Sequence, residues 1–543
     1  MVTFHKGGRQ AALFVAALAL ICTAYLTLNH RLVSELLYVF GEQSMHRVRF
    51  LAILLIVSGS LFIWMLLTVR TSLWTVLLLF FFASTLAGFA YFRITGIPLE
   101  SDVAEWLWSE RSQLTNALEE FFAPFLQSAA ITAALFSFVI AAALVARRNR
   151  PTLKHGLLIK FGKWAESVGL LLFVSWNSVL FNVDLPSSPV ETGSFLAFVA
   201  AWTAVEPDSE PVTLTAYSSP IERIVLVVDE SVRADYYDAL LKPEVIAAGG
   251  IDFGRAMSIA PCSAASNALL RWGINPRDTA SLARDPRRNP QLWGYGKAAD
   301  YQTFLFDGQS RGTPSNFLGA KERSKLTLLA SLEDGIDTDR KLASMVNLKI
   351  RGPERSLSYI VKRGTHFPYS SNYPSGTLPK GASLEATYKE AILYPNQQFI
   401  ARLTEGLDMS RTLIIYTSDH GQRLRRPGLS HCNSQPDSEE YAIPIALITG
   451  NKAWRAALLQ AASQNRDKAS QYQIFSTVLI AMGYDKEEVE RRYFPSLLSE
   501  NVGYYGVDPP YFPYPSSHFP RILIHRFPAF PYPRAARPGD GES

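Results

Sequence analysis

The sequence predicts a helical membrane domain followed by an α/β domain whose mostly parallel sheet is sandwiched by helices. Two observations support this prediction: long apolar runs are confined to the first third of the chain, and strand and helix patterns alternate after residue 219. At 543 residues the chain also exceeds one ordinary hydrophobic core. The predicted parts are a transmembrane domain 1–184, a linker 185–218, an α/β domain 219–503 and a C-terminal tail 504–543.

The membrane domain is predicted from five apolar runs, each about as long as a helix that crosses a ~30 Å hydrocarbon layer. These runs are residues 11–29, 50–69, 73–92, 125–146 and 166–183. The first is interpreted as a helix rather than a signal peptide, because no small-residue cleavage site follows it. Basic residues crowd the stretch 147–163, which places that connection and the N-terminus in the cytoplasm and the α/β domain outside.

The α/β domain is predicted from apolar, β-branched runs that alternate with helical patterns. The strand runs are 223–228, 302–306, 358–361 and 412–417, and the helical patterns include 384–406 and 469–482. This alternation indicates a mostly parallel sheet with helices on both faces, which binds its ligands at the carboxyl ends of the strands. The stretch 504–535 is dense in Pro, Tyr and Phe, so no regular element is expected there.

Charge and cysteine content exclude two classes of protein. The formal net charge is only +5 and the basic residues form no separate patch, so we expect no nucleic-acid partner. Three cysteines make no dense disulfide framework, and Cys22 lies inside the first apolar run. A single bridge in the α/β domain, between Cys262 and Cys432, is therefore the most that the sequence allows.

Polar residues follow two of the predicted strands directly. Asp229 and Glu230 come after the run that ends at Val228, and Asp419 and His420 come after the run that ends at Thr417. Carboxylate oxygens and imidazole nitrogens both bind Zn²⁺, at about 2 Å. The first segment taken alone also fits a helix N-cap, but two such strand ends in one sheet favour a metal site.

A turn of small residues, 261–268, enters an apolar helix between these two segments. A serine at the start of a helix lies near unpaired backbone N–H groups, whose partial positive charge favours an alkoxide and a phosphoryl oxyanion. The alternative interpretation is an ordinary serine N-cap.

Four segments resemble motifs of one superfamily. They are Val227–Asp235, Gly364–Tyr369, Tyr388–Asn396 and Ser418–Gly421. In this order they resemble the alkaline phosphatase and sulfatase superfamily, and the membrane-plus-soluble layout resembles its phosphoethanolamine transferase branch, which includes lipid A modifying enzymes. Within or beside these segments, Asp229 stands where a small residue is common in the branch, and Asn396 where Asp is usual.

The resemblance implies roles for individual residues. Glu230, Asp419 and His420 would hold zinc, and the nucleophile would complete the site. His366 and His431 would contact the phosphate or stabilise its charge. Arg233 would either contact phosphate or form an ion pair. Whether one or two metal ions bind stays open, because Asp229 fits either a second ligand or a cap.

The nucleophile is the main departure from the branch, which normally uses Thr, because no Thr lies between Met257 and Arg277. Ser263 is preferred, since residues 263–266 resemble the Ser-Ala-Ala-Ser of alkaline phosphatases. Cys262 is the rival, because sulfatases convert a similarly placed Cys into formylglycine, although the Pro and Arg of their maturation motif are missing. Ser266 is the third candidate. A bridge between Cys262 and Cys432 would exclude Cys262.

The function implied by the resemblance is zinc-dependent transfer of phosphoethanolamine from phosphatidylethanolamine to lipid A or an envelope glycan, through a covalent phospho-enzyme. The implied location is a bacterial inner membrane, with the catalytic domain in the periplasm and membrane lipid as a partner. Phosphoglycerol transfer, or phosphodiester or sulfate ester hydrolysis, would use the same metal site. A further alternative is a non-catalytic membrane assembly protein with a decayed site.

Overall fold

The computed structural model describes two compact units of the chain. The described residues are 3–28, 71–95, 121–149, 206–278, 284–309, 316–332, 335–424, 430–433, 436–507 and 524–527, with single positions between 37 and 67. One unit comprises residues 1–108 and 121–204, and the other comprises residues 109–120 and 205–543.

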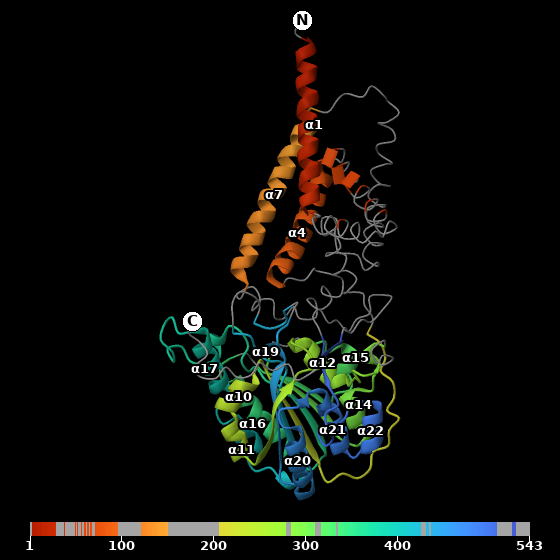
Figure 1. The fold of residues 1–543 in the computed structure, drawn as a ribbon, viewed down its shortest axis with the longest axis vertical. Helices are drawn as coiled ribbons and strands as arrows, with labels where there is room; N and C mark the ends of the chain where they lie inside the picture. Colours follow the sequence, from red (N-terminus) through yellow and green to blue (C-terminus); the bar gives the residue numbers. More distant parts are fainter. Residues whose placement is uncertain are drawn as a thin grey trace. The chain divides into compact units, whose positions relative to one another are not determined.

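The first unit contains the long apolar helices α1 (Thr3–Leu28), α4 (Thr71–Thr95) and α7 (Phe122–Arg148), coloured red to orange (Figure 1). Their shared core includes Ile21 and Ala143. By length and composition, two described helices are suited to cross a membrane: Gly8–Thr27 and Phe121–Arg148.

These helices test part of the five-span prediction. The predicted spans 11–29, 73–92 and 125–146 fall on α1, α4 and α7, although the apolar stretch of α4, Phe81–Ile94, is shorter than a membrane span. Span 50–69 is described only at single positions, and span 166–183 lies outside the described residues. Two of the described helices are therefore long and apolar enough to cross a membrane, whereas five spans were predicted. The number of spans and their orientation stay predictions.

The second unit is built on an eight-stranded sheet of order β4-β3-β5-β1-β6-β7-β2-β8. The strands are β1 (Arg223–Asp229), β2 (Gly250–Met257), β3 (Gln302–Asp307), β4 (Leu328–Ser331), β5 (Ser356–Val361), β6 (Thr412–Ser418), β7 (Ala442–Thr449) and β8 (Ala469–Ser470). Only β7 runs antiparallel to its neighbours β6 and β2. The predicted mostly parallel sheet is confirmed.

Helices cover both faces of this sheet (Figure 1). One face carries α10 (Ala234–Leu240), α11 (Lys242–Ala247), α16 (Thr338–Ile350), α17 (Leu384–Asn396) and α18 (Phe399–Thr404). The other carries α12 (Ser263–Trp272), α14 (Gln291–Ala298), α21 (Tyr472–Met482) and α22 (Lys486–Arg492). Neighbouring residues of β5 illustrate the alternation: Ile360 belongs to the first core, whereas the Tyr359 ring contacts Trp293 of α14. The remaining helices include α15 (Ala320–Arg323), α19 (Ser438–Tyr441) and α20 (Lys452–Asn465).

Three predicted elements need correction. The helix expected over 384–406 is two helices, because Gln398 has a positive φ of 60° and Pro395 sits in the last turn of α17. The pattern 469–482 begins as strand β8 before α21 starts at Tyr472. The tail does contain regular structure: β9 (Tyr504–Val507) pairs antiparallel with β10 (Ile524–Phe527), and both tetrapeptides lack proline.

The described part of the predicted linker is attached to the second unit. The Tyr217 amide donates to Gly483 O, and the Glu206 carboxylate accepts from the amides of Lys321 and Glu322 at the start of α15. A carboxylate at a helix N-terminus satisfies amides that have no partner inside the helix. The domain boundaries stay a prediction.

Candidate metal and nucleophile site

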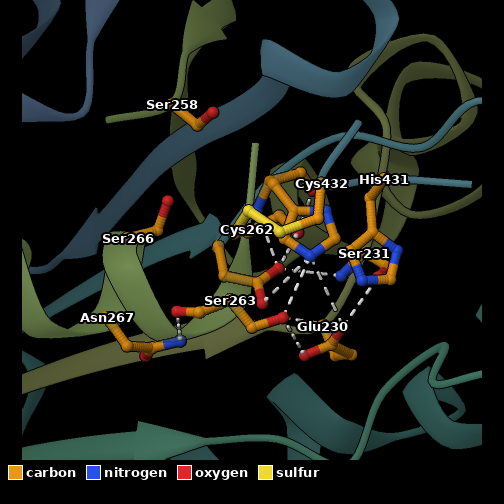
Figure 2. Close-up of polar contacts among 12 residues, drawn as sticks. Glu230, Ser231, Ser258, Cys262, Ser263, Ser266, Asn267, His431 and Cys432 are labelled. Carbon is orange, nitrogen blue, oxygen red and sulfur yellow. Dashed lines mark hydrogen bonds and ion pairs between the residues drawn. A yellow bond between two sulfur atoms is a disulfide. The ribbon is translucent and has the colours of Figure 1, made fainter. Parts of the chain in front are cut away.

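The candidate site lies where neighbouring strands end. β5, β1 and β6 are adjacent and parallel, so their carboxyl ends meet at one edge of the sheet. Glu230 follows β1 and Asp419 follows β6. β2 runs in the same direction and leads through a short turn into α12, which begins at Ser263 (Figure 2). Segments far apart in the sequence therefore bring their polar ends together.

Glu230, Asp419 and His420 form a buried cluster in which one ligand atom from each lies within 4.8 Å of the others. His420 Nε2 is 3.7 Å from Glu230 Oε1 and 3.6 Å from Asp419 Oδ2. Burial raises the pKa of Glu230, and burial together with the Glu230 charge raises the pKa of Asp419 to about 7. Two buried carboxylates at this distance repel each other when both are charged, and a bound cation would stabilise them.

The donor atoms of this cluster fit a divalent metal ion. Asp419 Oδ2 is buried and has no hydrogen-bond partner among the described residues. His420 Nδ1 lies 2.6 Å from Gly421 O, which assigns the ring proton to Nδ1 and leaves the Nε2 lone pair toward the carboxylates. Carboxylate and imidazole ligands of this kind suit Zn²⁺.

Two neighbouring side chains orient the Glu230 carboxylate. Ser231 Oγ donates to Glu230 Oε1 over 2.7 Å, and Gln309 Nε2 donates to Glu230 Oε2 over 2.7 Å. Ser231 has a positive φ of 57°, a conformation that costs a non-glycine residue about 1–2 kcal/mol. That backbone also directs the Ser231 amide to Asp419 Oδ1 at 2.9 Å. The local strain therefore coincides with contacts to two of the candidate ligands.

Ser263 is the candidate nucleophile that faces the cluster. Its Oγ lies 3.0 Å from His420 Nε2 and 3.4 Å from each Glu230 carboxylate oxygen. Asn267, one turn along α12, donates to Ser263 O and accepts from the Tyr359 hydroxyl. Ser263 is the first residue of the helix, so unpaired backbone N–H groups lie beside its hydroxyl.

The other two nucleophile candidates have different surroundings (Figure 2). Cys262 forms a disulfide with Cys432, so it carries no free thiol. Ser266 Oγ is fully buried; it donates to Ala260 O and accepts from the Ala260 amide, which closes the turn before α12. The bridge that the sequence left open is present, and it removes Cys262 from the candidates.

One further histidine, His431, contacts the cluster, and His366 lies near His431. The His431 ring stacks on His420 with 4.4 Å between centroids, and the disulfide holds the adjacent Cys432 against the start of α12. Burial and the nearby charges of His420 and His366 lower the pKa of His431 well below its usual range. His366 Nδ1 lies 2.8 Å from Phe367 O. The structure thus places His431 against the candidate ligand His420, and His366 close enough to His431 to affect its pKa.

Arg233 has a different set of partners. Its guanidinium makes two hydrogen bonds to Asp235, a 3.0 Å ion pair with Glu439 and a hydrogen bond to Gln422 O. It also lies over the Tyr236 ring. These partners form the ion-pair arrangement that was the alternative interpretation of Arg233.

Residues 222–484 match the model of the sulfatase family. This part of the chain is a sulfatase-family domain. For residues 222–484, this match supports the superfamily that the motifs resemble. No curated protein sequence matches the chain significantly.

Three solved structures are similar to this chain, and the first of them shows the shared fold. The integral membrane protein lipooligosaccharide phosphoethanolamine transferase A of Neisseria meningitidis is 15% identical, with 86% of this chain and 96% of that chain covered and a TM-score of 0.50. The C-terminal periplasmic domain of EptC from Escherichia coli, in complex with Zn, is 18% identical over 57% of this chain and 96% of that chain, with a TM-score of 0.44. The corresponding domain of phosphoethanolamine transferase EptC from Campylobacter jejuni is 19% identical over 53% and 95%, with a TM-score of 0.40.

Three residues near the site of the sulfatase domain were missed in the sequence. Lys362 directly follows β5 and Gln309 lies two residues after β3, so both stand at carboxyl ends of parallel strands. That position was an available signal, because it is the one that identified Glu230 and Asp419. Asn267 shows no such signal, since an Asn inside a helix is usually a surface residue.

Proposed function

We propose that the protein transfers a phosphoethanolamine head group from phosphatidylethanolamine to a hydroxyl or phosphate of an envelope acceptor, either lipid A or a glycan, with Ser263 as the nucleophile. The observation that carries this proposal is the position of Ser263 Oγ, at the N-terminus of α12 and 3.0 Å from His420 Nε2. A nucleophile beside a helix N-terminus and a buried carboxylate–imidazole cluster suits attack on a phosphodiester.

Glu230, Asp419 and His420 would hold Zn²⁺, and Ser263 would complete the ligand set. A bound zinc ion supplies positive charge that stabilises phosphoryl oxygens and lowers the pKa of a coordinated hydroxyl. Ser231 and Gln309 would keep the Glu230 carboxylate in position through their hydrogen bonds.

The proposed reaction has two displacements at phosphorus. In the first, a bond forms between Ser263 Oγ and phosphorus, the bond from phosphorus to the glycerol oxygen breaks, and the serine proton passes to that oxygen to give diacylglycerol. In the second, the acceptor oxygen attacks the same phosphorus, the bond to Ser263 Oγ breaks, and the acceptor proton returns to the serine. No redox partner is needed.

His366 and His431 are proposed to contact the phosphate. The low pKa of His431 keeps its ring neutral at pH 7, so one ring nitrogen is available to donate a hydrogen bond to a phosphate oxygen. The disulfide supports this role, because it links the residue after His431 to the residue before Ser263.

The disulfide also supports a periplasmic location, since such bonds persist in oxidising compartments. Membrane helices would keep the domain at the outer leaflet, where a lipid donor and an envelope acceptor have a high effective concentration. The disulfide argues against sulfate ester hydrolysis of the formylglycine type, because Cys262 has no thiol to convert.

The first test of this proposal is release of diacylglycerol from phosphatidylethanolamine with a fluorescent acyl chain by the full-length protein in detergent. We expect release that stops with a chelator, returns with zinc and falls by more than about 1,000-fold in Ser263→Ala, because loss of a nucleophile removes the covalent route.

The matched control is Ser463→Ala on the exposed side of α20, which should keep full activity. Ser266→Ala distinguishes the two serines of the turn, since it should lower stability more than turnover per folded molecule. Absence of release from folded, zinc-loaded wild type would reject the phosphoethanolamine donor. Phosphatidylglycerol as the donor then tests phosphoglycerol transfer.

A further inference from the structure

A lysine is completely buried behind the candidate metal ligand Glu230. The Lys362 ammonium lies 2.6 Å from Asp229 Oδ2, 2.5 Å from Asn396 Oδ1 and 3.9 Å from Asp339 Oδ2. These four side chains, with Tyr416, are called the Lys362 pocket below. A buried ammonium is tolerated only with charged and hydrogen-bonding partners, so this pocket is a compensated charge site.

Asp229 is fully engaged inside the Lys362 pocket. Its Oδ2 accepts from Lys362 and from the Tyr416 hydroxyl at 2.7 Å, and its Oδ1 accepts from the Glu230 amide at 3.0 Å. Gly364 packs against it so closely that a Cβ at this position would lie 2.6 Å from Oδ1. Protein atoms therefore occupy both oxygens of the carboxylate that the sequence left open as a second metal ligand.

Two connections lead from Lys362 to Glu230. The ammonium binds Asp229, whose other oxygen accepts from the Glu230 amide. The carbonyl of Lys362 accepts from Gln309 Nε2 at 2.9 Å, and the same nitrogen donates to Glu230 Oε2 at 2.7 Å. Lys362 is thus connected to the Glu230 backbone through Asp229 and to the Glu230 carboxylate through Gln309.

The remaining side of the ammonium faces an aromatic ring. Lys362 Nζ lies 4.5 Å from the centroid of the Phe399 ring. Aromatic faces attract ammonium groups, whereas a metal ion requires oxygen, nitrogen or sulfur ligands. The pocket is therefore suited to an ammonium and not to a second metal ion.

We propose that Lys362 is a positioning residue of the metal centre, which neutralises Asp229, orients Glu230 and limits the site to one metal ion. Asp229 and Asn396, which both depart from the pattern that the branch resemblance implies, accept hydrogen bonds from this same ammonium. The proposal depends on metal binding and not on the head group, so it can fail or hold independently of the proposed transfer reaction.

The test is zinc binding by the full-length protein in detergent, without lipid, measured as zinc content per chain and by competition with a chelator. We expect one zinc per wild-type chain and a zinc affinity lowered by about 10- to 100-fold in Lys362→Met, the range typical of residues that orient a metal ligand. Lys389→Met, at an exposed lysine of α17, is the matched control and should change affinity by less than about two-fold.

Cobalt substitution separates positioning from a general loss of structure. The visible absorption of bound Co²⁺ depends on its ligand geometry, so Lys362→Met should alter the spectrum while the far-ultraviolet circular dichroism of the protein is unchanged. Two zinc ions per wild-type chain would overturn the single-metal part of the proposal. Wild-type affinity and an unaltered cobalt spectrum in folded Lys362→Met would overturn the positioning part.

A double variant covers the case in which Lys362→Met fails to fold. Asp229→Asn together with Lys362→Met removes the buried Lys362–Asp229 ion pair. Asp339 keeps the hydrogen bonds that it accepts from the Arg363 and Gly364 amides, so we expect a folded protein. Its zinc affinity should still be at least about five-fold below wild type, because Glu230 has lost its charged support. Wild-type affinity in the folded double variant would contradict the proposal.

Discussion

Asp229 and Glu230 are consecutive carboxylates at the end of β1, yet their surroundings differ in charge. Asp229 is neutralised inside the protein by the Lys362 ammonium. Among the described residues, Glu230 accepts hydrogen bonds from the neutral side chains of Ser231, Gln309 and Ser263, and it faces a second carboxylate, Asp419. Both side chains are fully buried. Asp229 is therefore neutralised by a cation of the protein itself, whereas Glu230 is available to bind a metal ion.

This difference shows what a strand end does and does not determine. The end of a parallel strand places a carboxylate at the ligand-binding edge of the sheet, and this holds for both residues. A carboxylate that a lysine of the protein already neutralises is not available for a metal ion. That lysine comes from another part of the chain, as Lys362 does for Asp229. Substitutions at the two positions should therefore have opposite effects on stability and on metal binding.

The largest effect on metal binding is expected for Glu230→Gln. Loss of a candidate ligand should lower zinc affinity by more than about 100-fold, beyond the range typical of residues that only orient a ligand. Burial raises the pKa of Glu230, so the charged carboxylate is disfavoured in the metal-free protein. The thermal midpoint of the metal-free variant, followed by circular dichroism, should consequently equal or exceed that of the metal-free wild type.

The matched control for this substitution is Glu405→Gln, at an exposed position after α18, which should change neither quantity. A lower midpoint in metal-free Glu230→Gln would mean that the carboxylate already has an internal cation. That result would remove the contrast with Asp229.

A loss of stability is the main effect expected for Asp229→Asn. This change leaves the Lys362 ammonium buried without its carboxylate at 2.6 Å, and breaking a buried pair typically costs about 3–5 kcal/mol. The thermal midpoint of the zinc-loaded protein should fall by roughly 10 °C, given about 2–4 °C per kcal/mol for a domain of this size.

Asp300→Asn provides the control for that change, because Asp300 is exposed and its positive φ of 61° is one that Asn tolerates. Zinc content should stay at one ion per chain in both variants. Loss of the zinc with an unchanged midpoint in Asp229→Asn would instead make Asp229 a metal ligand.

The parts that were predictable from the sequence are those with a local physical signal. Runs of β-branched residues located β1 and β6, and the polar residues after them located Glu230, Asp419 and His420. The sequence limited any disulfide of the α/β domain to Cys262 and Cys432, the two cysteines outside the first apolar run, but left open whether it forms.

The parts that were missed depend on contacts between distant segments. The Lys362 pocket joins residues from β1, β6, α16 and α17 to the residue after β5, and no local pattern records which lysine neutralises which carboxylate. The β9–β10 pair was missed because its prolines lie beside the strands rather than in them. The break at Gln398 is set by a single backbone conformation, which composition over a helical window does not reveal.

The smallest expected effect, and the one that bears on both carboxylates together, is that of Gly364→Ala. Gly364 has a φ of +52°, and a Cβ there would lie 2.6 Å from Asp229 Oδ1 and 2.7 Å from Glu230 N. Gly376 has a φ of +88° and open space around its Cβ position, so Gly376→Ala carries the backbone strain without the contact. Each substitution should cost about 1–2 kcal/mol through the backbone, but only Gly364→Ala should also weaken zinc binding, by several-fold. Equal zinc affinities in the two variants, measured by chelator competition, would show that the spacing between Gly364 and the carboxylates does not matter, and that Glu230 keeps its position through Ser231 and Gln309 alone.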